Sequence, residues 1–200
     1  MKTDSSLIVT PDSSLLSGVI CLIRNHFGEV TSSRDDDPIR DAFEHHFQAS
    51  GKQMRASLSL DASQALGLDS HTAQCLAACV EALHNASLVL DDFQDSALER
   101  RGHPTVCALF GRDVALGLTL RLTTTAFVSL SQIKNVEQLA SLTMEVHQAV
   151  ADTILGQTWD QDDTKIEAVE QVKLTASMKS GPLFGLSVSL PLLAAGHTEA

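Results

Sequence analysis

A long apolar segment that ends in three aspartates constrains the fold of this chain more than any other feature. Asp69 is suited to cap a helix, and apolar residues at helical spacing continue from it up to Asp91. Asp92 and Asp95 follow within one further turn. The pattern predicts a helix over residues 69–95 that is apolar along most of its length and acidic at its end.

Other segments show the same helical periodicity, and turn signals separate them. Tyrosine is absent, prolines are few, and Gly-rich strand–turn patterns are missing. These features favour an all-α chain that folds as a single domain over residues 1–200, with residues 1–12 expected to be disordered or loosely attached. The remaining helices are expected at 13–28, 38–49, 51–67, 105–131, 135–157 and 166–195, with a turn at 102–104.

Composition limits the classes of partner. The net charge of −11 argues against nucleic acid as a partner. With 44% apolar residues the chain can bury a sizeable core, yet we expect no transmembrane segment, and the first ten residues do not resemble a signal peptide. The four cysteines lack C-x-x-C spacing, so we expect buried, reduced thiols in a cytoplasmic protein rather than disulfides or a zinc site.

The acidic end of the long helix is a candidate metal site. Asp91 and Asp95 are four residues apart and share one helical face, and we expect Asp92 beside them near the rim. Like charges at this spacing cost roughly 0.2–0.5 kcal/mol, so such a cluster is tolerated at a solvated helix end or around a cation. Mg²⁺ fits, because it takes one or two carboxylates together with phosphate oxygens. A solvated acidic helix end is the alternative.

Basic residues on either side of the acids suit a diphosphate ligand. Arg100 and Arg101 follow the cluster within a few residues, while Lys52 and Arg55 are three apart at an expected helix start. Guanidinium and ammonium groups, together with backbone N–H groups at a helix start, can hold diphosphate oxygens. A solvated basic turn, or ion pairs of the arginines with nearby acids, is the alternative.

Further polar residues lie on apolar helices. His84 and Ser87 share the face of Asp91, so a polar stripe runs back from the acids. An ordinary core histidine is the alternative for His84. Gln157 could be a helix-capping residue, and Lys179, in an apolar helix, could snorkel to solvent.

Six short motifs occur in a fixed order along the chain: GKxxR at 51–55, ExxH at 81–84, DDxxD at 91–95, RRG at 100–102, GQxxD at 156–160 and KSG at 179–181. In this order they resemble the trans-isoprenyl diphosphate synthase (polyprenyl synthetase) family over about residues 38–200. The resemblance implies an isoprenoid-synthase bundle of antiparallel helices around a deep cavity, usually in a homodimer, with a heteromer as the alternative. It also implies Mg²⁺-dependent condensation of an allylic diphosphate with isopentenyl diphosphate.

Matching the motifs residue by residue implies three groups of site residues. Mg²⁺ and the allylic diphosphate would be held by Asp91, Asp92 and Asp95, with Arg100 on the same diphosphate. Isopentenyl diphosphate would be bound by Lys52, Arg55, His84 and Arg101. The allylic site and its developing cation would be lined by Gln157 and Lys179.

Product length in the family depends on side chains one turn before the first aspartate. Ala86 and Ser87 occupy those positions here, and both are small. A small wall lets the product grow past fifteen carbons, so we expect a C20 (geranylgeranyl) or longer product.

Three positions depart from the family pattern. The family's second aspartate-rich motif does not occur up to Ala200, its Gly-Asp pair reads Gly117-Leu118, and Val172 stands where a tyrosine is usual. We expect a fragment of a longer synthase, truncated at the C-terminus and turning over little or nothing by itself. The alternatives are a short subunit completed by a partner and a fold kept without catalysis.

Two other functions compete with prenyl transfer. A class I terpene synthase on the same fold would not need the isopentenyl diphosphate residues, so their presence argues against it. A non-catalytic partner subunit of a prenyl synthase would fit the missing second motif, whereas the retained aspartates argue for ligand binding.

Overall fold

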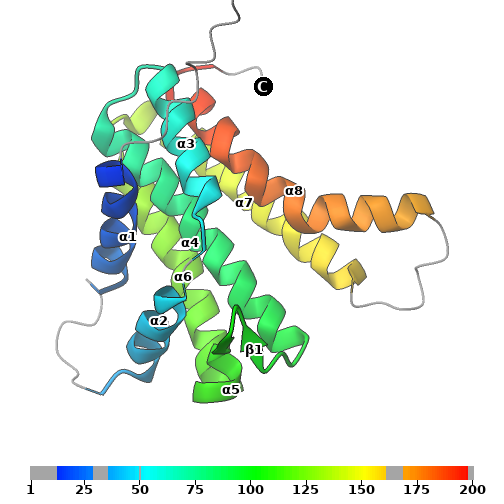
Figure 1. Cartoon of the computed structure of the whole chain (residues 1–200). Helices are drawn as coiled ribbons and strands as arrows, with labels where there is room; N and C mark the ends of the chain where they lie inside the picture. Colours follow the sequence, from blue (N-terminus) through cyan, green and yellow to red (C-terminus); the bar gives the residue numbers. More distant parts are fainter. Residues whose placement is uncertain (1–12, 29–35, 50, 161–168, 198–200) are drawn as a thin grey trace, which may run out of the picture.

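The structure, a computed structural model, describes residues 13–28, 36–49, 51–160 and 169–197 (Figure 1). The predicted disorder of residues 1–12 lies outside these ranges. The described residues are helical apart from one short hairpin, which confirms the all-α prediction. The elements are α1 (Ser13–Gly28), α2 (Pro38–Gln48), α3 (Met54–Ala65), α4 (Ser70–Gln94), β1 (Glu99–Arg100), β2 (His103–Pro104), α5 (Val106–Phe110), α6 (Arg112–Ser131), α7 (Val136–Asp160) and α8 (Val169–Ala194).

The predicted long helix is α4, which lies at the centre of the bundle (Figure 1). Its N-cap is Asp69, whose carboxylate accepts hydrogen bonds from the backbone N–H groups of His71 and Thr72, both at 3.1 Å. Because α4 packs against α1, α3, α6 and α8, its apolar side chains form the middle of the core. Those that are almost fully buried include Leu76, Val80, Leu83 and Val89.

Two predicted helix boundaries were wrong, and backbone conformation explains both. The helix expected over residues 105–131 is divided into α5 and α6 at Gly111, whose φ of 91° no helix accommodates. The helix expected from residue 51 begins only at Met54, because Gln53 adopts a left-handed conformation with φ of 49°.

Helices α7 and α8 form a pair that extends away from the rest of the bundle (Figure 1). α7 continues to Asp160, beyond its expected end at residue 157. α8 packs against α3 and α4, and it changes direction along its course, as expected for a helix with Pro182 in its interior. Large apolar side chains of the pair are exposed, namely Met144, Ile154, Leu155, Val172, Leu174, Phe184 and Val188.

Two helices, α4 and α6, are long and apolar enough to cross a membrane by length and composition. A buried core helix meets the same criteria, so the expectation of no transmembrane segment stays a prediction. The two helices pack against each other, and 72% of the apolar window of α4 and 44% of that of α6 is buried. A helix at the centre of a bundle carries apolar side chains on every face because it is surrounded by apolar groups, as a membrane-spanning helix is.

All four cysteines are free. Cys75 and Cys79 are buried in α4, where burial raises the pKa of Cys75 to about 11 and also raises that of Cys79. The prediction of buried, reduced thiols therefore holds for these two residues. It was wrong for Cys21, which is exposed, and Cys107 is only partly buried.

Candidate active site

The residues matched to isopentenyl diphosphate line one polar pocket of about 610 Å³ between α3 and α4, whereas Arg100 and the three aspartates of the DDxxD motif do not line it. The motifs that contribute them are about thirty and fifty residues apart in the chain, and helix packing brings them together. All four residues matched to isopentenyl diphosphate are present: Lys52, Arg55, His84 and Arg101.

Arg55 and His84 contact each other at the inner wall of this pocket. Arg55 Nη1 lies 3.3 Å from His84 Nε2, and since arginine can only donate, Nε2 accepts and the imidazole proton is on Nδ1. Burial, together with the charges of Arg55 and Arg101, lowers the pKa of His84 to about 4. His84 is therefore a neutral member of a cationic pocket at physiological pH.

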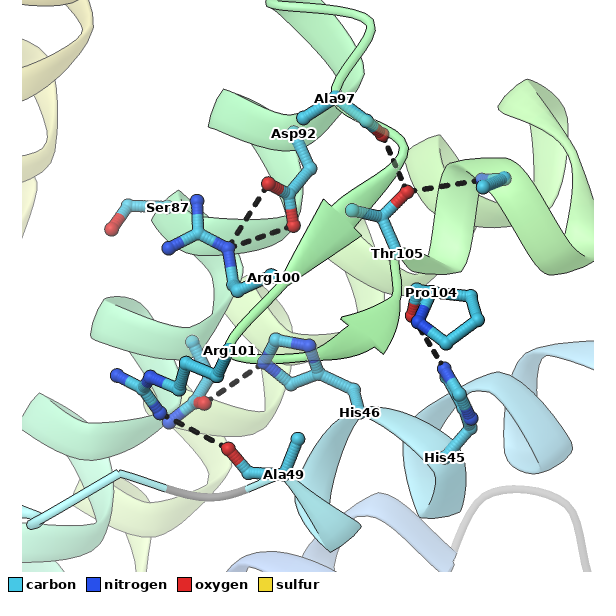
Figure 2. Close-up of polar contacts among 12 residues, drawn as sticks. His45, His46, Ala49, Ser87, Asp92, Ala97, Arg100, Arg101, Pro104 and Thr105 are labelled. Atoms are coloured by element: carbon cyan, nitrogen blue, oxygen red, sulfur yellow. Dashed lines mark hydrogen bonds and ion pairs between the residues drawn. The ribbon is translucent and has the colours of Figure 1, made fainter.

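The turn predicted at residues 102–104 is part of a β-hairpin that carries both arginines of the RRG motif. β1 and β2 pair antiparallel with Arg100 opposite His103, and the turn residues Arg101 and Gly102 have φ values of 54° and 79°. Positive φ at both central positions is typical of tight two-residue hairpins, which explains the glycine. Figure 2 shows the two arginines reaching different anchors, Asp92 and Ala49.

Arg101 lines the polar pocket, and a hydrogen bond to the end of α2 fixes its side chain. Its Nη1 donates to the carbonyl of Ala49 at 3.1 Å, at the C-terminal end of α2. A Cβ atom at Gly51 would lie 2.5 Å from the same nitrogen. The glycine of the GKxxR motif thus leaves room for the guanidinium, so the two motifs are sterically linked.

Asp92 is buried, with 4% of its surface exposed, so the expectation that it lies near the rim was wrong. Arg100 Nε donates to its Oδ1 at 3.0 Å and to its Oδ2 at 2.9 Å. This ion pair points the Asp92 carboxylate at the hairpin (Figure 2). In this structure Asp92 holds Arg100 in place, and its predicted role as a metal ligand remains a prediction.

Asp91 and Asp95 lie at the end of α4 as predicted, the first partly buried and the second exposed. Burial raises the pKa of Asp91, and the neighbouring charges of Lys179 and Arg100 oppose that rise. Within the described part of the chain, no three His, Cys, Asp or Glu side chains are grouped closely enough to hold a metal ion. Asp91 and Asp95 offer carboxylate oxygens, the ligand type that Mg²⁺ takes together with phosphate oxygens, and Mg²⁺ binding here stays a prediction.

A second pocket, of about 100 Å³, lies between α4, α7 and α8 and adjoins the first through Arg55 and His84. It contains Asp91, Gln157 and Lys179, so the predicted allylic residues also come together. Gln157 is buried, and its Nε2 has no hydrogen-bond partner among the described residues.

Lys179 is fixed by the acid of the GQxxD motif. Its Nζ lies 2.7 Å from Oδ2 of Asp160, which sits in the last turn of α7 and does not cap the helix. Partial burial lowers the pKa of Lys179, but the hydrogen bond to Asp160 and the charges of Asp91 and Asp95 outweigh this and raise it. A Cβ at Gly156 would lie 2.5 Å from the Lys179 backbone nitrogen, so this glycine permits α7 and α8 to approach closely.

A third pocket, of about 310 Å³, is apolar and lies between α4, α6, α7 and α8. Ala86 and Ser87 contribute to its wall, and Ser87 also lines the second pocket. Sequence reasoning missed the part of the wall supplied by α6, because threonines rarely indicate an apolar cavity. The α6 residues that line it are Leu116, Thr119, Leu120 and Thr123.

The hydroxyl groups in this wall bond to the backbone of their own helices. Ser87 Oγ donates to the His84 carbonyl at 2.8 Å, and Thr119 Oγ1 to that of Ala115 at 3.0 Å. Thr123 Oγ1 donates to the Thr119 carbonyl at 2.9 Å, and Thr153 Oγ1 donates to the Ala149 carbonyl at 2.8 Å. The cavity surface is consequently almost entirely hydrocarbon.

One departure from the family pattern has a structural reason. Leu118, in place of the aspartate of the family's Gly-Asp pair, is fully buried in the core. A Cβ at Gly117 would lie 2.9 Å from the Cδ1 atom of Ile39, so this glycine allows α6 to approach α2. At this position the chain uses its side chain for packing.

Comparison with known proteins agrees with these features. The polyprenyl synthetase family matches residues 36–200. A geranylgeranyl pyrophosphate synthase from Geoglobus acetivorans is 29% identical over 90% of this chain and 57% of its own length, and a short chain isoprenyl diphosphate synthase from Methanothermobacter thermautotrophicus is 30% identical over 82% and 56%.

Solved structures show the same fold. The geranylgeranyl pyrophosphate synthetase from the archaeon Geoglobus acetivorans superposes with a TM-score of 0.80 at 27% identity, covering 92% of this chain and 61% of its own. An isoprenoid synthase family member from Thermotoga neapolitana superposes with a TM-score of 0.76 at the same identity, covering 90% of this chain and 72% of its own. The chain thus spans somewhat more than half the length of the curated relatives that it matches. Its fold is that of the isoprenoid synthases, and the chain belongs to the polyprenyl synthetase family.

Proposed function

We propose that this chain is part of a trans-prenyltransferase that condenses an allylic diphosphate with isopentenyl diphosphate. The observation that carries the proposal is the succession of three adjoining pockets along α4: basic, then mixed acidic and basic, then apolar. This order matches a reaction in which two diphosphates lie at one end and a hydrocarbon chain extends away from them.

Binding of isopentenyl diphosphate is assigned to the first pocket. Lys52, Arg55 and Arg101 supply the positive charge, and neutral His84 supports Arg55. A class I terpene synthase would need no such second diphosphate pocket, so the pocket favours prenyl transfer.

The allylic diphosphate is assigned to the second pocket. Asp91 and Asp95 would hold Mg²⁺ shared with the diphosphate, while Asp92 fixes Arg100 close by. Mg²⁺, when bound, neutralises the diphosphate and favours its departure. Lys179 adds a cation to the same pocket, and Gln157, whose Nε2 has no hydrogen-bond partner among the described residues, also lines it.

The growing hydrocarbon chain is assigned to the third pocket. Its hydrocarbon surface keeps water from the reactive carbon, which favours attack by the alkene of isopentenyl diphosphate. Small side chains at Ala86 and Ser87 support a C20 or longer product, and the relatives include proteins named geranylgeranyl pyrophosphate synthases.

The deciding experiment is an incubation of the chain with Mg²⁺, isopentenyl diphosphate and C5, C10 or C15 allylic diphosphates, with products identified by mass spectrometry. Because the chain spans little more than half of its relatives, Mg²⁺-dependent binding of a non-reacting allylic diphosphate analogue should be measured in parallel. Asp91→Ala should abolish that binding, and Asp152→Ala, at a half-buried α7 residue that lines none of the three pockets, should leave it unchanged. If the chain forms no product and also shows no Mg²⁺-dependent binding of the analogue, the proposal is refuted.

A second candidate is a non-catalytic subunit that binds a full-length synthase, and the exposed apolar side chains of α7 and α8 favour it. Activity that arises only on mixing with a synthase would support this candidate, and a homodimer with activity of its own would exclude it. We also propose a cytoplasmic location, which the four free cysteines support.

A further inference from the structure

Arg112 is the first residue of α6, and its side chain contacts the acidic end of α4. Its Nη1 donates to the Phe93 carbonyl at 3.2 Å, and its Cζ lies 3.9 Å from the centroid of the Phe93 ring. Gly111, with φ of 91°, ends α5 and begins α6. The break at this glycine is what makes Arg112 a helix-terminal residue in contact with α4.

Phe93 is the uncharged member of the DDxxD segment that Arg112 contacts. It lies two residues from Asp91 and two from Asp95, so at roughly 100° per residue its side chain points away from the face that these carboxylates share. Its ring is partly buried and packs against the core. A contact on Phe93 therefore fixes the back of the helical turn whose other face carries the predicted metal ligands.

The bond from Arg112 also satisfies a carbonyl at the end of α4. The last carbonyls of a helix lack partners farther along the same helix, so other groups must supply them. The Asp91 carbonyl accepts from the backbone N–H of Asp95 at 2.9 Å, and the Asp92 carbonyl accepts from that of Ala97 at 3.0 Å. The next carbonyl, that of Phe93, accepts from Arg112. A cation at this end also interacts favourably with the helix dipole.

The turn that follows α4 requires support, because Ser96 has φ of 51°. Residues other than glycine rarely adopt this left-handed conformation, and it persists where surrounding contacts hold it. Thr105 holds the far side of the turn. Its Oγ1 donates to the Ala97 carbonyl at 2.7 Å (Figure 2), and its backbone N–H donates to the Leu98 carbonyl at 3.0 Å. Arg112 holds the near side, at the helix itself.

We propose that Arg112 is a positioning residue of the allylic diphosphate site: through Phe93 it holds the last turn of α4, so that Asp91 and Asp95 stay in place to bind Mg²⁺. The inference rests on the proposed function only in that this end of α4 binds Mg²⁺ with a diphosphate. Electrostatics alone predicts that any cation at residue 112 is sufficient. Positioning instead requires the planar guanidinium, which covers a ring and donates a hydrogen bond at the same time.

The first measurement is amide hydrogen exchange of the whole chain without ligand, resolved at single residues by NMR. Arg112→Ala should accelerate exchange of the Asp95 and Ala97 amides about tenfold, because both donate to carbonyls in the last turn of α4. Arg24→Ala is the matched control, since Arg24 is also exposed and is paired with Glu44 at 2.8 Å, and it should leave these two amides unchanged. Unchanged exchange in Arg112→Ala would overturn the proposal.

The second measurement is the Mg²⁺-dependent affinity for a non-reacting allylic diphosphate analogue, determined by titration calorimetry. Arg112→Ala should weaken binding about fivefold, and Arg112→Lys should still weaken it about threefold although the charge is kept. The affinity for inorganic pyrophosphate without Mg²⁺, which reports on the polar pocket, should not change in either variant. Full affinity in Arg112→Lys would show that charge alone matters, and an equal loss for pyrophosphate would show a general loss of structure. Either result would refute positioning.

A double-mutant cycle tests whether Arg112 acts through the ring. Arg112→Ala should cost less affinity in the Phe93→Leu background than in the unmodified chain, whereas additive losses would refute the route through Phe93. If the unmodified chain shows no Mg²⁺-dependent binding of the analogue, the proposed function fails and the positioning role fails with it. If the unmodified chain binds and Arg112→Ala binds equally well, only the positioning role fails.

Discussion

The polar and apolar pockets both adjoin α4, and both have residues with polar side chains in their walls. In the polar pocket the long or charged side chains of Lys52, Arg55 and His84 line the wall. In the apolar pocket the hydroxyls of Thr119 and Thr123 are bonded to carbonyls one turn back. The comparison teaches that side-chain length decides whether a polar residue makes a pocket polar. The hydroxyl of a serine or threonine can donate its hydrogen bond to a carbonyl of its own helix, whereas a long charged side chain cannot.

The largest expected effect comes from acidification. Burial lowers the pKa of His46 and of His84 to about 4, below the value of about 6.5 in an unfolded chain, so the unfolded state binds more protons between those values. Stability is therefore lost as the pH falls from about 6.5 to about 4. From pH 7 to pH 5 we expect a loss on the order of 2 kcal/mol for each histidine in the free energy of unfolding.

Urea unfolding at the two pH values measures this loss. His46→Gln should remove about half of it, whereas Thr123→Val, in the apolar pocket, should leave it unchanged. An equal pH dependence in both variants would show that His46 is not a source of this loss.

Removal of the central cation should be the next largest effect. Arg55→Ala should weaken pyrophosphate binding by about 100-fold, since a charged hydrogen-bond donor is lost from a partly buried site. Arg55→Lys should recover only part of the affinity, because an ammonium cannot reproduce the guanidinium contacts. Binding of an uncharged prenyl alcohol, measured by fluorescence competition, should not change. An equal loss of affinity for the alcohol would show that Arg55 affects the apolar pocket as well as the polar pocket.

Filling the apolar pocket should weaken binding of the prenyl chain, whereas Arg55→Ala should weaken binding of the diphosphate. Ala86→Phe places a ring in the wall of that pocket, so a C20 prenyl diphosphate should bind about tenfold more weakly and a C10 analogue almost unchanged. In an active, completed enzyme the same variant should shorten the product, as read by mass spectrometry. An unaltered preference for chain length would show that Ala86 does not limit the length of the product.

The smallest expected effect tests the hydroxyl argument directly. Thr123→Val keeps the shape and deletes a hydroxyl that is already bonded to the Thr119 carbonyl at 2.9 Å. Binding of C10 and C20 analogues should change less than about twofold, because the cavity surface remains hydrocarbon. A clear gain in affinity for the C20 analogue would indicate that the hydroxyl faces the cavity in solution.

Much of the fold could be predicted from periodicity and capping. The central helix, its Asp69 cap and its acidic end follow from local sequence alone, because a cap and an apolar stripe act within a few residues. The division of α5 from α6 was missed, since a lone glycine in an apolar run reads as part of a helix until its φ is known.

The site was predicted in part. The motifs indicated the residues that line the polar and mixed pockets, including Lys52 and Lys179. The burial of Asp92 under Arg100 was not foreseen, because adjacent aspartates look alike in a sequence and differ only in which side of the helix is covered. The α6 wall of the apolar pocket was missed because threonines rarely indicate an apolar cavity.

The sequence by itself determined the family, the helices and the identity of most site residues, since these depend on residue type and on spacing along one chain. Only the tertiary structure decided which carboxylate is buried and that hydroxyl-bearing residues contribute to a hydrocarbon wall. The physical reason is that burial and hydrogen-bond partnership belong to pairs of elements, and the same side chain acts differently according to what is packed against it.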